Sequence, residues 1–262
     1  MIKLIVCDMD GTLLNDEKQL NEDFWDLEPK LADKGIKFAI ASGRQYYNLV
    51  DKFDSIKDKL IFLADNGSYV VYRDEQVHLD SLDKESANKF IEIGRTVPDA
   101  YVIVSAKKSA YVENTDERFL KEAGKYFKRM EIVADLTKVE DTILKVTICD
   151  FKNSETNSYL YFKEFEKDYK VAIAGKIWLD ISDWGANKGT AIKKIQEQFG
   201  ISAEETMVFG DYLNDLEMMS AAKYSYAMKN AHPKILEAAN YVTKYTNNEN
   251  GVFETIKEMN LI

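Results

Sequence analysis

The chain has 262 residues, of which 45% are hydrophobic and 12% aromatic, and its 45 acidic and 35 basic side chains give a formal net charge of −10. With only 3 Pro and 12 Gly, the composition excludes a disordered, collagen-like or low-complexity chain. A pI near 4.9 excludes general nucleic-acid binding, which requires clustered Lys and Arg. An anionic ligand would therefore need a local source of positive charge, such as a metal ion.

The cysteines and the apolar runs place the protein in the cytoplasm. Cys7 and Cys149 are too few for a disulfide framework and match no zinc signature, so we expect both to be small buried side chains. The N-terminus reaches Asp8 before a signal peptide could form. No apolar run approaches the roughly 18 residues of a membrane span. We expect a soluble cytoplasmic protein that contacts no membrane.

The first part of the chain alternates between strands and helices. Continuous apolar runs predict strands at 2–7, 36–41 and 60–64, and helical spacing of apolar residues predicts helices at 22–34 and 45–53. This order is typical of a doubly wound parallel sheet. A hairpin with strands at 69–72 and 76–79 follows the turn signal Asn66-Gly67.

The middle of the chain has a different pattern, and the tail returns to alternation. Between residues 82 and 183 we predict helices at 84–96, 117–129 and 158–167 and strands at 100–104, 110–113, 141–148, 170–173 and 177–181. Paired strands of this kind indicate an inserted α+β domain with an antiparallel sheet. The tail predicts helices at 189–199, 214–221 and 232–239 and strands at 206–209 and 224–227. The predicted fold is an α/β, doubly wound core (1–82 and 184–262) interrupted by an α+β domain (83–183).

Asp8-Met9-Asp10-Gly11-Thr12 directly follows the first strand. Ligands of open α/β sheets bind just beyond the carboxyl ends of the strands. Side chains two residues apart on extended chain share a side, so Asp8 and Asp10 can converge on one point. Two close carboxylates repel unless a cation lies between them. The alternative interpretation is an Asp-rich turn that ends a strand.

A second acidic cluster, Gly210-Asp211-Tyr212-Leu213-Asn214-Asp215, follows a predicted strand near the other end of the chain. If the next helix begins near Asp211, then Asp211, Asn214 and Asp215 lie on one helix face. Capping of the helix by Asp211 is the alternative, because helix N-termini favour carboxylates.

Two further residues could contact a phosphate. Ser42, in Ala41-Ser42-Gly43-Arg44, is either an ordinary helix N-cap or a donor to a phosphate oxygen. Lys188 stands at the start of a helix, where a lone lysine is usually solvated. Together with a carboxylate-bound cation, these donors are the equipment of phosphoryl transfer.

In their order and spacing, these segments resemble the four motifs of the haloacid dehalogenase superfamily. The motifs are Asp8-Met9-Asp10-Gly11-Thr12, Ser42-Gly43-Arg44, Lys188-Gly189 and Gly210 to Asp215. The insert between the second and third motifs is similar to a C2-type cap, most closely that of the Cof-like (IIB) phosphatases. The resemblance implies a Rossmann-like core, a cap that closes over the substrate, and Mg²⁺ as cofactor.

The resemblance also implies roles for the acidic residues. Asp8 would be the nucleophile that forms an aspartyl-phosphate, and Asp10 the general acid and base. Mg²⁺ would be held by the carboxylates of Asp8 and Asp211 and by the backbone carbonyl of Asp10. Asp215 would support this metal shell.

The same resemblance implies how the phosphoryl group is held. Ser42, with the backbone of Met9 and Gly43, would bind the phosphoryl oxygens. Lys188 would neutralise charge on Asp8 and on the phosphate, and Asn214 would help to orient them.

The expected activity is Mg²⁺-dependent hydrolysis of small phosphate monoesters, with sugar phosphates as the expected substrates. A phosphomutase and a non-catalytic phosphometabolite-binding module are the alternatives. A binding module has no need of the general acid Asp10. Nothing in the sequence indicates an oligomeric state.

Overall fold

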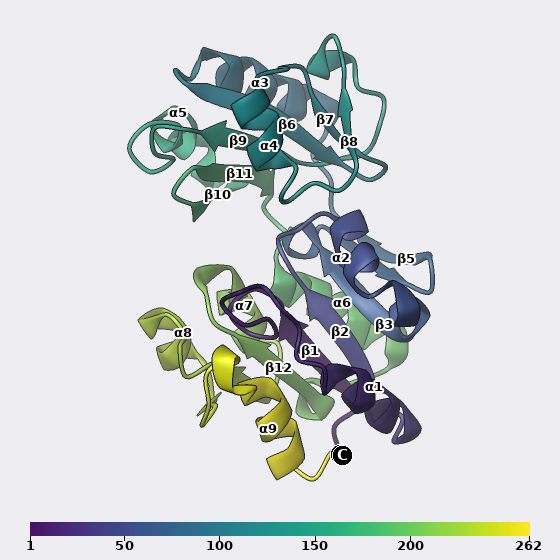
Figure 1. The fold of residues 1–262 in the computed structure, drawn as a ribbon. Helices are drawn as coiled ribbons and strands as arrows, with labels where there is room; N and C mark the ends of the chain where they lie inside the picture. The colour runs from purple at the N-terminus through teal and green to yellow at the C-terminus, as the bar shows by residue number, and fades with distance from the viewer. The chain divides into compact units, whose positions relative to one another are not determined.

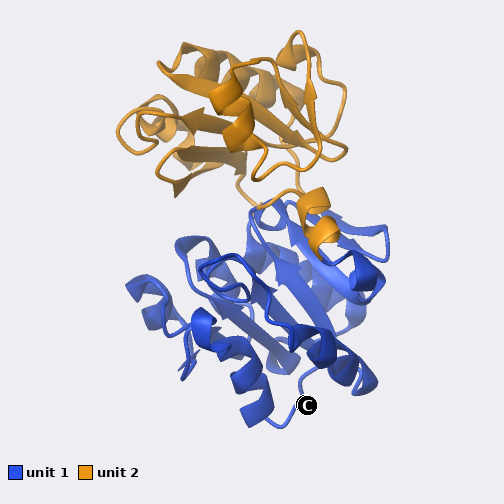
Figure 2. Cartoon of the chain, viewed as in Figure 1, with its two compact units in different colours: residues 1–43, 53–78, 187–262 blue, residues 44–52, 79–186 orange.

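The structure is a computed structural model that describes all residues from 1 to 262, and the chain divides into two compact units (Figure 2). Unit 1 comprises residues 1–43, 53–78 and 187–262, and unit 2 comprises residues 44–52 and 79–186. Unit 1 is therefore assembled from both ends of the chain. None of the helices combines the length and the apolar character needed to cross a membrane.

The first sheet has eight strands in the order β14-β13-β12-β1-β2-β3-β4-β5. The six strands from β14 to β3 are parallel to one another, and β4 pairs with β3 antiparallel. The strand order reverses between β1 and β12, and such a switch point is where open α/β sheets bind ligands. The strands are β1 (Leu4–Asp8), β2 (Lys37–Ala41), β3 (Leu60–Ala64), β4 (Tyr69–Tyr72), β5 (Glu75–Leu79), β12 (Thr206–Gly210), β13 (Tyr224–Ala227) and β14 (Tyr241–Val242).

The central parallel strands are buried on both faces, as their continuous apolar sequences predict, whereas the edge strand β14 is exposed. All residues of β1, β3 and β12 are buried. Helices cover both faces of the sheet, with α1 and α9 on the near side and α6 on the far side in Figure 1. The helices of unit 1 are α1 (Phe24–Asp33), α6 (Lys188–Phe199), α7 (Leu216–Met219), α8 (Pro233–Ala238) and α9 (Gly251–Glu258).

Unit 2 contains a second sheet of six strands in the order β10-β11-β9-β6-β7-β8. All pairs are antiparallel except β7 with β8. The strands are β6 (Ala100–Ala106), β7 (Ala110–Val112), β8 (Met130–Ile132), β9 (Ile143–Asp150), β10 (Tyr169–Gly175) and β11 (Trp178–Asp183). The helices are α2 (Tyr46–Lys52), α3 (Lys84–Thr96), α4 (Glu117–Ala123) and α5 (Tyr159–Phe162), with short 3-10 turns η3 (Leu136–Lys138) and η4 (Lys163–Lys167).

Each face of the second sheet packs into its own apolar core. Phe90 and Ile91 of α3 lie in the first core with Val146 and Ile148 of β9. Phe119 of α4 lies in the second, with residues of β6 and β7 and with Cys149. Cys7 and Cys149 are both buried free thiols, as predicted.

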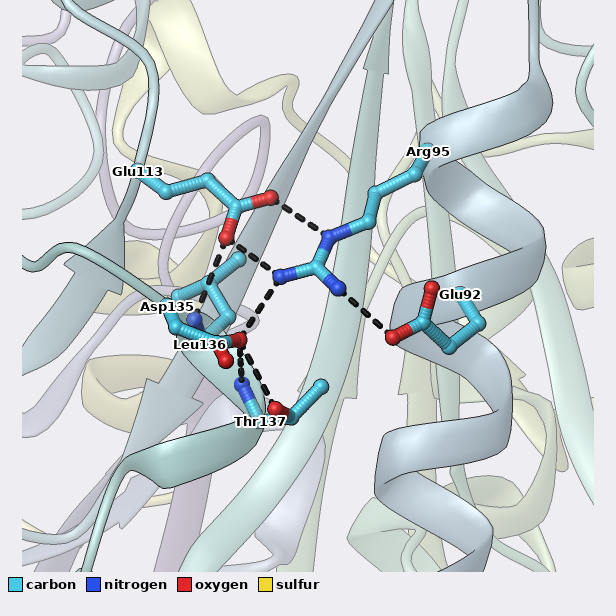
Figure 3. A network of polar contacts seen from close by, with 6 residues as sticks. All are labelled: Glu92, Arg95, Glu113, Asp135, Leu136 and Thr137. Carbon is cyan, nitrogen blue, oxygen red and sulfur yellow. Dashed lines mark hydrogen bonds and ion pairs between the residues drawn. The ribbon is translucent and has the colours of Figure 1, made fainter.

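A charged network centred on Arg95 joins three elements of unit 2 (Figure 3). The guanidinium of Arg95, in α3, donates to both carboxylate oxygens of Glu113 at 2.7 and 2.6 Å. It also donates to Glu92 at 2.6 Å and to Asp135 at 2.9 Å. Glu113 in turn accepts from the backbone N–H of Leu136 at 3.1 Å. The network thus ties α3 to the chain that follows β7 and to η3.

The predicted α/β fold with an inserted second sheet is confirmed, and the main errors concern helix lengths and the tail. The helix predicted at 117–129 ends at Ala123, because Gly124 follows, and residues 130–132 form β8. The helix predicted at 214–221 is a 3-10 turn, η6 (Leu213–Asp215), followed by the short α7. Strand β14 and helix α9 were not predicted.

Candidate functional site

The ends of β1, β2 and β12 bring the predicted site residues together. Asp8 is the last residue of β1 and pairs in register with Ala41 of β2, so Ser42 follows beside it. Cys7 pairs with Phe209 of β12, so the turn that carries Asp211 follows on the other side. Segments from residues 8, 42 and 211 therefore meet at one edge of the sheet.

Lys188 lies wholly inside this site. Asn187 caps α6 by accepting from the backbone N–H of Thr190 at 2.8 Å, and Lys188 is the first residue of the helix. Its ammonium group donates to Asp8 and, at 2.6 Å, to Asp215, and its side chain is 0% exposed. A lysine at the start of a helix is usually solvated, but Lys188 is buried and paired.

The charges around Lys188 keep it protonated. Burial by itself would lower the pKa of Lys188, but the carboxylates of Asp215 and Asp8 outweigh burial and raise it. Lys188 is therefore a fixed buried cation that pairs with two carboxylates of the cluster.

Three carboxylates gather beside this one lysine. Ligand oxygens of Asp8, Asp211 and Asp215 all lie within 4.8 Å of one another. Burial and the charge of Asp215 raise the pKa of Asp8. The same two causes raise the pKa of Asp211 to about 6, although a hydrogen bond of 3.0 Å from Thr12 opposes them. A cation between these groups would relieve their repulsion.

The donor set fits a divalent metal ion. All three side chains offer oxygen, which is the ligand that hard cations such as Mg²⁺ and Ca²⁺ prefer. The cluster has one positive charge against three carboxylates, so the metal-free site carries excess negative charge. The expected ligands Asp8 and Asp211 lie in this cluster, and Asp215 lies with them.

Asp215 also shapes the turn after β12. Its carboxylate accepts from the backbone N–H groups of Asp211 at 2.9 Å and Tyr212 at 3.2 Å. The prediction that Asp211, Asn214 and Asp215 share one helix face is wrong, because η6 begins only at Leu213. Capping of a helix by Asp211 is wrong as well, since Asp215 is the residue that satisfies these backbone donors.

Asp10 follows the end of β1 by two residues, and its carboxylate is not among the three that gather beside Lys188. Its carboxylate is 32% exposed and pairs with Lys18 at 3.2 Å. The hydroxyl of Thr12 donates to the carboxylate of Asp211 at 3.0 Å. Thr12 is therefore a link between the first and last motifs that the sequence reasoning missed.

The predicted phosphate-binding residues follow the same strand ends. Met9 is fully buried and Ser42 is 2% exposed. Ser42 is not an N-cap, because α2 begins only at Tyr46. Its backbone N–H donates to the carbonyl of Leu63 at 2.9 Å. Asn214 donates from Nδ2 to Asn66 at 3.0 Å. Asn66 was read only as a turn residue, although the Asn-Gly pair marked its position.

Comparison with known proteins identifies the family. The family model described as haloacid dehalogenase-like hydrolase matches residues 5–256. The 5-amino-6-(5-phospho-D-ribitylamino)uracil phosphatase YbjI of Escherichia coli K12 is 34% identical, with 98% of this chain and 96% of the relative covered. The Bacillus subtilis 168 phosphatase YcsE, which carries the same activity in its name, is 28% identical, with 98% and 95% covered.

A solved structure agrees over the whole chain. SMU.1108c from Streptococcus mutans UA159 matches with a TM-score of 0.88 and 27% identity, covering 100% of both chains. The α/β core with its inserted second sheet is thus a known architecture. The chain belongs to the haloacid dehalogenase-like hydrolases and is a phosphatase.

Proposed function

We propose that this protein is a Mg²⁺-dependent phosphatase that hydrolyses phosphate monoesters of sugars and sugar alcohols through an aspartyl-phosphate on Asp8. The observation that carries the proposal is the buried Lys188, which pairs with Asp8 and Asp215 beside the carboxylate of Asp211. A buried lysine between carboxylates at strand ends is costly for stability alone. The arrangement of Lys188 among these carboxylates therefore supports a site that binds both a metal ion and a phosphate.

Asp8 and Asp10 divide the chemistry between them. A carboxylate oxygen of Asp8 attacks phosphorus, and the bond from phosphorus to the ester oxygen breaks. Asp10 gives its proton to the leaving alkoxide, which departs as the alcohol. Asp10 then takes a proton from water, which attacks the phosphorus of the aspartyl-phosphate, and Asp8 is released with inorganic phosphate.

The metal ion would be held by the carboxylates of Asp8 and Asp211 and the carbonyl of Asp10, with Asp215 in support. When bound, it neutralises charge on the phosphoryl group and on the carboxylates. Lys188 fixes the carboxylate of Asp8 in place and attracts the phosphoryl oxygens. Ser42, the backbone N–H groups of Met9 and Gly43, and Asn214 complete the set of donors to these oxygens.

The names of two relatives indicate a class of substrate. Two relatives carry the name of a phosphatase for 5-amino-6-(5-phospho-D-ribitylamino)uracil, whose phosphate is on a sugar alcohol. We assign catalysis to unit 1 and the choice of leaving group to unit 2, the proposed cap. A phosphorylated polyol chain is the feature that the substrate in these names shares with the expected sugar phosphates, so we assign this class of substrate.

A substrate panel tests the proposal. The panel holds 5-amino-6-(5-phospho-D-ribitylamino)uracil, hexose and pentose phosphates, and p-nitrophenyl phosphate, each with Mg²⁺ and with EDTA. We expect Mg²⁺-dependent phosphate release, fastest from a phosphorylated polyol, with ¹⁸O from labelled water in the phosphate. Isomerised substrate with almost no released phosphate would indicate a mutase. No turnover of any member would contradict the proposal.

A further inference from the structure

The turn after β3 has an unusual backbone. Asp65, Asn66 and Gly67 form a 3-10 turn, η2, and all three have positive φ, of 47°, 58° and 97°. Consecutive residues in the left-handed region are disfavoured for L-amino acids and persist only where the surroundings hold them. The hydroxyl of buried Ser68 helps, since it donates to the carbonyl of Asp65 at 2.9 Å. Such strain gathers at functional sites, so the contacts of this turn bear on function.

Asn66 joins two segments that carry proposed phosphate-binding groups. Its backbone N–H donates to the carbonyl of Ser42, after β2, at 2.9 Å. Its side-chain Oδ1 accepts from Nδ2 of Asn214, after β12, at 3.0 Å. One residue therefore fixes the backbone at Ser42 and the amide plane of Asn214. The second N–H of that amide is then held in a defined direction.

The packing around the turn is close. A Cβ at Gly43 would lie 3.1 Å from Oδ1 of Asn66. The Asn66 amide therefore lies against the backbone of Gly43, which is a predicted phosphate-binding residue. A Cβ at Gly67 would lie 2.7 Å from the carbonyl of Asn187, the cap of the helix that Lys188 begins. The turn thus contacts the segments of Ser42, Lys188 and Asn214.

We propose that Asn66 is a positioning residue for the phosphoryl group, acting through Ser42 and Asn214. This inference rests on the proposed function. The left-handed backbone places the Asn66 amide between the two segments, and Asn tolerates this conformation better than most residues. Loss of the Asn66 side chain removes the oxygen that accepts from Asn214, while the backbone can keep its conformation.

Asn66→Gly isolates the side chain, because Gly adopts the left-handed conformation without strain. The matched control is Asn250→Gly. Asn250 has nearly the same backbone, with φ 59° and ψ 38° against 58° and 28°, and is also half-buried, but it is the N-cap residue of α9. The readouts are KM and kcat for the best substrate of the panel, the Kd for inorganic phosphate with Mg²⁺, and thermal unfolding.

We expect Asn66→Gly to raise KM and the phosphate Kd about tenfold, the effect of one lost hydrogen bond to a binding group. Asn250→Gly should leave both unchanged. Because Asn66 acts through Asn214, the double variant Asn66→Gly with Asn214→Ala should lose no more than the worse single variant. Additive losses, an unchanged phosphate Kd in Asn66→Gly, or equal losses in Asn250→Gly would overturn the assignment to Asn66 and leave the proposed function standing. A wild-type protein that neither hydrolyses the panel nor binds phosphate would overturn both.

Discussion

At the scale of single residues, the buried charges of unit 1 distinguish the proposed catalytic site from an ordinary strand end. Lys188 is fully buried between Asp8 and Asp215, and Asp211 lies beside them. The sequence alone favoured a solvated Lys188, and only the order of the four motifs suggested its role. Exposure depends on how β1, β12 and α6 converge, which local sequence does not encode. Asn66 was missed for the same reason.

Lys188→Met tests the charge balance of the site. With the cation removed, the buried carboxylates of Asp8 and Asp215 and the half-buried one of Asp211 face each other without it. In EDTA we therefore expect the free energy of unfolding to fall by about 3 kcal/mol. The measurement is urea unfolding followed by circular dichroism. Lys194→Met is the matched control on α6, because Lys194 is 45% exposed and pairs only with Glu197. Equal effects of the two substitutions would contradict the role given to Lys188.

Asp211→Asn tests the proposed metal site. Asparagine removes one charge from the carboxylate cluster and keeps an oxygen that can accept from Thr12. In EDTA the variant should be at least as stable as the wild type. Mg²⁺ at about 100 times its Kd should stabilise the wild type by about 2.7 kcal/mol, and the variant far less. Thermal shift with and without Mg²⁺ measures this, with exposed Asp54→Asn as the control. An equal Mg²⁺ shift in Asp211→Asn would exclude Asp211 as a ligand.

At the scale of elements, the sequence predicted strands better than helices. The core strands are continuous apolar runs buried on both faces, and such runs have few other solutions. Helices α4 and α7 were predicted too long because apolar spacing continues past their ends, into Phe127 in one case and Ala221 in the other. Gly124 ends α4, and the hydrogen bonds of Asp215 delay the start of α7. Two-residue β14 is too short to carry any pattern.

The Arg95 network predicts a pH-dependent stability of unit 2. Hydrogen bonds from Arg95 lower the pKa of Glu113 and lower that of Asp135 to about 2. Both carboxyls therefore bind protons more weakly in the folded than in the unfolded chain. Their contribution to the free energy of unfolding is complete above the unfolded pKa values, at about pH 5, and is lost as the pH falls toward 2.

Arg95→Met should remove this contribution. We expect the difference in unfolding free energy between wild type and variant to be constant from pH 7 to about 5 and to shrink below that. Denaturant unfolding at each pH measures it. Arg118→Met is the control, because the Arg118 guanidinium lies over the ring of Phe151, and its effect should not change with pH. A difference that grows on acidification would refute this account.

At the scale of the whole molecule, the net charge of −10 is compatible with binding a phosphate because the charged side chains are unevenly distributed. A few carboxylates from both ends of the chain converge with Lys188 at the switch point of the sheet. The other acidic side chains contribute to a net negative charge that disfavours association with polyanions. The inserted second sheet could be predicted, since paired strands interrupt the alternation of strands and helices. The substrate could not, because the side chains that choose a leaving group follow no general pattern.

The most direct test of the account is phosphate release from p-nitrophenyl phosphate by Asp8→Asn in the presence of Mg²⁺. Asparagine fills the same space but lacks the nucleophilic carboxylate, so we expect turnover to fall by at least about 1,000-fold. Circular dichroism and thermal unfolding should remain those of a folded protein, and exposed Asp54→Asn should retain full activity. Turnover by folded Asp8→Asn within tenfold of the wild type would contradict an aspartyl-phosphate on Asp8.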